Sequence, residues 1–154
     1  MKPMNQTSGV ALVSKILVPT DFSAHARNAL DWAQYLARAF GARLILLHVV
    51  DISGPAVVNC AMAGADPLPL LRQAAQNDMD QLRTLAPDAE TLVREASVRP
   101  AIVEAALELN CQMIVMGTHG RSGLPHLLLG SVAEYVVRNS SVPVLTVRAQ
   151  REQD

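Results

Sequence analysis

The run Lys15-Ile-Leu-Val-Pro-Thr20 is followed by a helical pattern over residues 23–40 and then by the apolar run Arg43-Leu-Ile-Leu-Leu-His-Val-Val50. The apolar residues of the middle segment recur with the period of a helix. Ser23 is placed to cap this helix, and Gly41 to end it in a left-handed conformation. The second apolar run is nearly continuous, as expected for a strand that is covered on both faces. The stretch therefore predicts a strand, a helix and a second strand.

The rest of the chain continues this alternation. The patterns predict further helices over 70–86, 101–109 and 132–138, and further strands over 91–98, 113–116 and 142–147. Asn110 is placed to end the 101–109 helix in a left-handed conformation. Strands that alternate with helices are typical of an α/β protein with an open parallel sheet and helices on both faces.

The connection over 51–69 interrupts the rhythm. Gly54, Pro55, Gly64, Pro67 and Pro69 stand there among small residues. Connections of this length are uncommon within a compact domain. We therefore predict either a functional lid or a locally disordered segment.

The composition narrows the class of protein. The 154 residues fit one domain, and 50% hydrophobic residues against 18% charged residues exclude a disordered chain. Thirteen Lys and Arg residues stand against 14 acidic residues, so the formal net charge is −1. A nucleic-acid-binding protein usually carries a basic excess, and one Trp, two Tyr and two Phe leave few rings for stacking on bases. We expect no nucleic-acid partner.

Cysteine usage and the N-terminal segment indicate the compartment. Cys60 and Cys111 are the two cysteines, and they form neither a disulfide framework nor a zinc-ligand pattern. The first nine residues lack the apolar region of a secretory signal, and no apolar run approaches the roughly 18 residues of a membrane span. We expect a cytoplasmic protein without membrane insertion.

Polar and glycine residues gather where predicted strands end. Pro19-Thr20-Asp21 follows the first strand, and Gly117-Thr-His-Gly-Arg-Ser-Gly123 follows the strand over 113–116. Gly130-Ser131 opens the last helix. Ligands of open α/β sheets bind at the carboxyl ends of the strands, and glycines together with a helix N-terminus suit a phosphate. The sequence therefore predicts an anion site here, although it carries neither a Walker P-loop nor a G-x-G-x-x-G after the first strand.

Structural readings of the same residues stay open. Ser131-Val-Ala-Glu134 has the pattern of a capping box, Asp21 suits an Asx turn before Ser23, and Gly120 suits an ordinary turn. His48 is predicted to be a core or rim histidine with a satisfied hydrogen bond. Cys111 is predicted to be buried and inert.

The spacing Gly117-x₂-Gly120-x₉-Gly130-Ser131 resembles the ATP-binding motif G-x₂-G-x₉-G-[S/T] of the universal stress protein family. Lys15-Ile-Leu-Val-Pro-Thr-Asp-Phe-Ser23, Leu46-Leu-His-Val-Val50 and Pro143-Val-Leu-Thr-Val147 also resemble that family's first, second and fifth strands. The resemblance extends over about 14–148, the expected core of a single domain over 1–154. Three segments depart from the family pattern: Ala96-Ser-Val-Arg-Pro100, Asn110-Cys-Gln112 and the connection over 51–69, which carries no family signature.

The resemblance implies a Rossmann-like, five-stranded parallel sheet of order 3-2-1-4-5, and it assigns roles to residues. Asp21 would contact the nucleoside, and the Val49 backbone would read the adenine edge. The resemblance places the ribose and the nearer phosphates beside Gly117, His119 and Gly120, and the phosphate tail against Gly130, Ser131 and Val132. Pro19, Thr20 and Met116 complete the expected site. Mg would be carried on the phosphates of ATP, ADP or AMP, without a protein ligand set.

The function implied is that of an adenine-nucleotide-binding regulatory protein of the stress response. It would act as a nucleotide-dependent sensor with at most weak ATP hydrolysis, because the sequence offers no Walker lysine, no acidic pair to hold a metal and no evident base other than His119. A slow ATPase and a nucleotide-free scaffold dimer are the alternatives. The edge strand Val142-Pro-Val-Leu-Thr-Val147 would join two copies into a homodimer.

Overall fold

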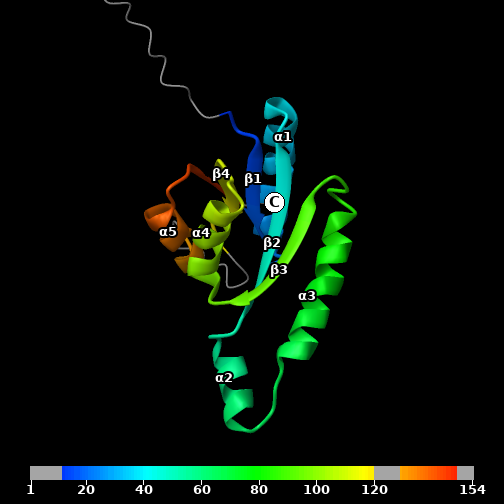
Figure 1. Cartoon of the computed structure of the whole chain (residues 1–154), viewed down its shortest axis with the longest axis vertical. Helices are drawn as coiled ribbons and strands as arrows, with labels where there is room; N and C mark the ends of the chain where they lie inside the picture. Colours follow the sequence, from blue (N-terminus) through cyan, green and yellow to red (C-terminus); the bar gives the residue numbers. More distant parts are fainter. Residues whose placement is uncertain (1–11, 120–128, 149–154) are drawn as a thin grey trace, which may run out of the picture.

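The computed structural model describes residues 12–119 and 129–148 (Figure 1). Five strands form one all-parallel sheet in the order β3-β2-β1-β4-β5, which confirms the predicted α/β class and strand order. The elements, in chain order, are β1 (Lys15–Pro19), α1 (Ala24–Phe40), β2 (Arg43–Asp51), α2 (Pro55–Met62), α3 (Leu68–Arg83), β3 (Glu90–Ala96), α4 (Val98–Glu108), β4 (Met113–Gly117), α5 (Ser131–Asn139) and β5 (Val144–Val147).

The core has two layers, one on each face of the sheet. Alternate residues of β1 point to opposite faces, so Ile16 and Val18 pack with α1 and α3, whereas Leu17 packs with α4 and α5. All three side chains are almost completely buried. Figure 1 shows α4 and α5 on one side of the sheet and α1 and α3 on the other. Both faces are covered, as the continuous apolar runs of the strands require.

The predicted ends of α1 are confirmed. Ser23 accepts a hydrogen bond from the backbone N–H of Ala26 at 3.2 Å, and Gly41 ends the helix with φ 67°. Asn110 likewise has a left-handed backbone, with φ 53°. These residues turn the chain out of α1 and α4, and the cap at Ser23 starts α1 just beyond the carboxyl end of β1.

Several helix starts differ from the prediction because proline is tolerated in a first helical turn. Pro69 lies in the first turn of α3 and Pro100 in that of α4, so these helices begin at Leu68 and Val98 rather than later. The segment over 51–69 is not an irregular connection, because α2 begins at Pro55 within it. α2 buries none of its side chains and lies beyond the end of the sheet (Figure 1).

The ends of the remaining elements differ by a few residues from the prediction. α3 ends at Arg83 rather than at 86, β3 ends at Ala96 rather than at 98, and β5 begins at Val144 rather than at 142. Residues 120–128, between β4 and α5, lie outside the described residues. Within the described part of the chain, no helix is both long enough and apolar enough to cross a membrane.

Candidate functional site

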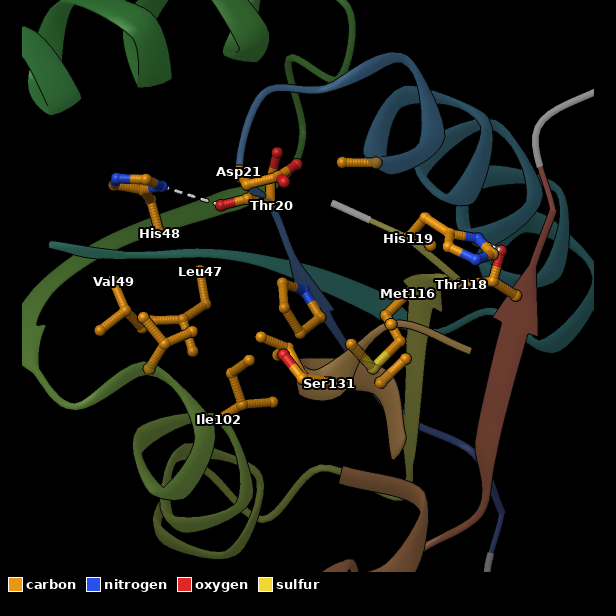
Figure 2. Close-up of a pocket in the computed structure, with 17 residues that line it drawn as sticks. Thr20, Asp21, Leu47, His48, Val49, Ile102, Met116, Thr118, His119 and Ser131 are labelled. Atoms are coloured by element: carbon orange, nitrogen blue, oxygen red, sulfur yellow. Dashed lines mark hydrogen bonds between the residues drawn. The ribbon is translucent and has the colours of Figure 1, made fainter. Parts of the chain in front are cut away.

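A cavity of about 370 Å³ opens at the carboxyl ends of β1, β2 and β4, where the order of the strands reverses (Figure 2). This volume lies within the range of small-molecule sites. The structure brings the predicted site residues together around this one cavity: Pro19, Thr20, Asp21, Val49, Met116, Gly117, His119, Gly130, Ser131 and Val132. The remaining predicted residue, Gly120, lies outside the described residues.

One wall of the cavity is apolar. Leu47 and Val49 of β2, Ile102 of α4 and Met116 of β4 line it (Figure 2). Their side chains also belong to the core layer beneath α4 and α5, so the wall is rigidly packed. Sequence reasoning missed Leu47 and Ile102, because an apolar residue that lines a cavity has the same pattern as one that fills a core.

Hydrogen bonds fix the turn between β1 and α1. The Thr20 N–H donates to the Leu47 carbonyl at 2.8 Å, and the Phe22 N–H donates to Thr20 Oγ1 at 3.0 Å. Asp21 Oδ1 accepts from the Ser23 N–H at 3.0 Å, which confirms the Asx turn. Phe22 has a left-handed backbone with φ 65°, a conformation that bulky residues rarely adopt. The turn therefore holds Thr20 and Asp21 at the cavity in one defined shape.

His48 lies at the mouth of the cavity, which sequence reasoning did not predict. Its Nδ1 lies 2.8 Å from the Thr20 carbonyl oxygen, as the dashed line in Figure 2 marks. The predicted satisfied hydrogen bond is confirmed, and the ring is half-buried rather than enclosed in the core.

The opposite wall joins the end of β4 to the start of α5. The Gly130 N–H donates to the Thr118 carbonyl at 2.6 Å, and the Thr118 N–H donates to the Val147 carbonyl at 2.9 Å. Thr118 Oγ1 and His119 Nδ1 lie 2.9 Å apart. These bonds hold the ends of β4, β5 and α5 together at the cavity.

The first turn of α5 opens into the cavity through Ser131 and Val132. The predicted capping box is wrong, because Gly130 rather than Ser131 precedes the helix and no side chain caps it. The Gly130 carbonyl accepts the Glu134 N–H at 2.9 Å. A helix N-terminus without a side-chain cap presents backbone N–H donors and a positive dipole end, which attract an anion.

The charges around the cavity are few. Among the described lining residues, Asp21 carries the one carboxylate, and His48 and His119 carry imidazole rings. Within the part of the chain that the structure describes, no group of three His, Cys, Asp or Glu residues could hold a metal ion. Backbone dipoles rather than side-chain charges therefore set the polarity of the described walls.

Cys111 lies away from the cavity, before β4, and is 4% exposed. Burial raises the pKa of its thiol above the usual 9.0, against a smaller opposing effect of Lys15. The prediction of a buried cysteine is confirmed.

Comparison with known proteins shows the family. The model of the universal stress protein family matches residues 13–148. Universal stress protein MJ0531 of Methanocaldococcus jannaschii is 34% identical over 152 residues, covering 95% of this chain and 88% of that protein. The solved structure of MJ0577, from the same organism, superposes with a TM-score of 0.80 at 30% identity and covers 92% of this chain and 99% of that one. A universal stress protein solved in complex with cAMP has a TM-score of 0.58 and 26% identity, covering 91% of this chain and 100% of that one. This chain is a member of the universal stress protein family.

Proposed function

We propose that this protein binds ATP, ADP or AMP in the cavity and acts as a nucleotide-dependent regulator in the stress response. One observation carries the proposal: an apolar wall and an uncapped helix N-terminus face the same cavity at the switch point of the sheet. An adenine base needs the first feature and a phosphate group needs the second.

The backbone of β2 supports recognition of a base. The Leu47 carbonyl accepts the Thr20 N–H, and the Arg43 N–H donates to the Ser14 carbonyl. The odd-numbered residues of β2 therefore point their backbone N–H and C=O groups toward β1. Val49 is also odd-numbered, so its backbone groups point to the same side, but the pairing of β2 with β1 ends at Leu47. The N–H and C=O of Val49 therefore point past the end of β1, toward the cavity, where they suit the polar edge of adenine.

The start of α5 supports binding of phosphates. Gly130 carries no side chain, and Ser131 and Val132 contribute backbone N–H groups of the first helical turn. We propose that Mg reaches the site on the phosphates, where it neutralises part of their charge. Asp21 would contact the nucleoside, and Gly117 and His119 would border the ribose.

In this proposal, the binding of a nucleotide in the cavity, rather than its hydrolysis, regulates the protein's partners. The described lining contains no lysine, arginine or pair of carboxylates to stabilise a transferring phosphoryl group. β2 leads from the cavity directly to α2, and β5 lies at the sheet edge beside β4. A bound nucleotide could bias either element, and a homodimer paired across β5 would transmit the change to a second copy.

A cyclic nucleotide is a second candidate, since a universal stress protein of 26% identity was solved in complex with cAMP. Its base would use the same apolar wall, and its single phosphate would need only the first turn of α5.

The test has two parts. Small molecules released from heat-denatured purified protein are identified by mass spectrometry, and the stripped protein is titrated calorimetrically with ATP, ADP, AMP, cAMP and GTP. We expect an adenine nucleotide in the released fraction and tighter binding of adenine nucleotides than of GTP. Binding of none of the five, in protein with native circular dichroism, would overturn the proposal.

A further inference from the structure

His48 occupies an exceptional position in β2. The strand is apolar from Leu44 to Val50 apart from this residue, and its neighbours Leu47 and Val49 are buried in the core. His48 is the one residue of that run that is only partly buried. An aliphatic side chain would continue the strand equally well. The imidazole is therefore best explained by the contacts that it makes.

The first contact determines which ring nitrogen of His48 carries a proton. A carbonyl oxygen only accepts hydrogen bonds, so the 2.8 Å contact with the Thr20 carbonyl requires a proton on His48 Nδ1. The Thr20 N–H is already bound to the Leu47 carbonyl at 2.8 Å. Both backbone groups of Thr20 are thus held by β2, one residue beyond the last pairing of β1 with β2.

The second contact supports the unusual backbone of Phe22. The rings of Phe22 and His48 lie 4.5 Å apart between centroids, inclined at 33°. Phe22 has φ 65°, which is disfavoured for a bulky residue and persists only where surrounding contacts impose it. The His48 ring and the bond from the Phe22 N–H to Thr20 Oγ1 are two such contacts.

Asp21 lies between the two residues that His48 holds. It lines the cavity, and its Oδ1 accepts the Ser23 N–H at 3.0 Å. We propose that His48 is a positioning residue, which holds the turn from Thr20 to Phe22 so that Thr20 and Asp21 face the nucleoside. This inference rests on the proposed function, because the nucleoside is the ligand that the turn would position.

Two substitutions separate positioning from packing. In His48→Asn, an amide N–H takes the place of Nδ1–H and can still donate to the Thr20 carbonyl. In His48→Leu, the volume is retained approximately, but no donor remains. We expect His48→Leu to weaken calorimetric binding of the tightest adenine nucleotide by about tenfold, the size of one lost hydrogen bond, and His48→Asn by about threefold or less. Equal affinities in all three proteins, or equal losses in both variants, would overturn the proposal.

Nuclear magnetic resonance of the ligand-free protein gives a second readout. The imidazole ¹⁵N shifts of wild type should show His48 protonated at Nδ1, and scalar couplings should show a positive φ at Phe22. We expect the hydrogen bond to the Thr20 carbonyl to be the dominant restraint, so that His48→Asn keeps this positive φ and His48→Leu, which retains only an apolar contact with Phe22, loses it. A deprotonated Nδ1 in wild type, or an unchanged Phe22 in His48→Leu, would overturn the proposal.

The two readouts also separate this inference from the proposed function. If wild type binds no adenine nucleotide while the Nδ1 proton and the Phe22 response are observed, the proposed function fails and the control of the turn by His48 stands. If His48→Leu does not fold, the wild-type ¹⁵N shifts and the His48→Asn variant still decide the outcome.

Discussion

Gly117, at the end of β4, lies directly against the backbone of His25 in the first turn of α1. A Cβ atom at Gly117 would stand 3.0 Å from the carbonyl carbon, the carbonyl oxygen and the Cβ of His25. The rings of His25 and His119 also lie 5.6 Å apart between centroids. The first glycine of the family motif therefore has a packing role, since it lets α1 approach β4, in addition to any role toward a ligand.

We expect Gly117→Ala to lower the free energy of unfolding by about 1–3 kcal/mol, because the methyl group meets helix backbone that cannot rotate away. Urea denaturation followed by circular dichroism measures this change. Gly130→Ala is the matched control and should cost clearly less. An unchanged midpoint in Gly117→Ala would show that α1 moves aside freely.

Gly130→Val should abolish nucleotide binding while the fold survives. Gly130 has φ −71° and ψ 161°, an extended conformation that valine adopts without strain. The isopropyl group would stand where the phosphates approach the start of α5. Calorimetry with ATP measures the effect, and the thermal midpoint shows whether the fold is intact. Wild-type affinity in the folded variant would refute the placement of the phosphates.

Hydrolysis of ATP should be slow. With magnesium present, we expect a turnover far below the enzyme median of roughly 10 s⁻¹, and no further loss in His119→Ala. His119 Nδ1 lies 2.9 Å from the hydroxyl of Thr118, and the ring lies beside that of His25 in the first turn of α1. A steady-state phosphate-release assay on both proteins decides the matter. Turnover near the median that disappears in His119→Ala would make this protein an ATPase.

Assembly through β5 can be tested at one residue. The Ile114 N–H donates to the Pro143 carbonyl and the Thr118 N–H to the Val147 carbonyl, each at 2.9 Å. Because backbone direction alternates along a strand, Thr146 points its N–H away from β4. We expect Thr146→Pro to convert a dimer into a monomer in light scattering, without loss of the sheet.

Thr146→Val is the matched control for the assembly test, because it keeps the N–H and should remain dimeric. A wild-type protein that is monomeric at micromolar concentration would remove β5 as the interface.

Burial of Cys111 should make the stability of the protein depend on alkaline pH. Since burial raises the pKa of the folded thiol above 9.0, the unfolded chain ionises first as the pH rises. The stability that depends on a neutral Cys111 thiol is complete below about pH 9, and it is lost as the pH rises through the folded pKa. Thermal midpoints between pH 7 and 11 should fall more steeply in wild type than in Cys111→Ala. Parallel curves for the two proteins would contradict the expectation.

The secondary structure was largely predictable, because each apolar run and each helical period is a local property. α2 was not, since an eight-residue helix that buries no side chain leaves no apolar period in the sequence. The strand order came from the family resemblance rather than from the patterns.

The candidate site was predictable in part, because residues that follow parallel strands meet at one edge of the sheet. His48 escaped prediction because its contact with Thr20 joins residues 28 positions apart. The capping role predicted for Ser131 is wrong, because α5 begins at Ser131, one residue earlier than the pattern indicates, so that Gly130 takes the capping position.

The exposed position of α2 offers a practical opening for protein engineering. No side chain of Pro55–Met62 is buried, so this segment can be exchanged or interrupted without removing atoms from either core layer. It is also joined directly to β2, whose residues Leu47, His48 and Val49 line the cavity. A fluorescent domain inserted between Gly54 and Gly64 would be attached a few residues from the cavity, which makes this connection a natural place to build an optical reporter of the proposed nucleotide binding.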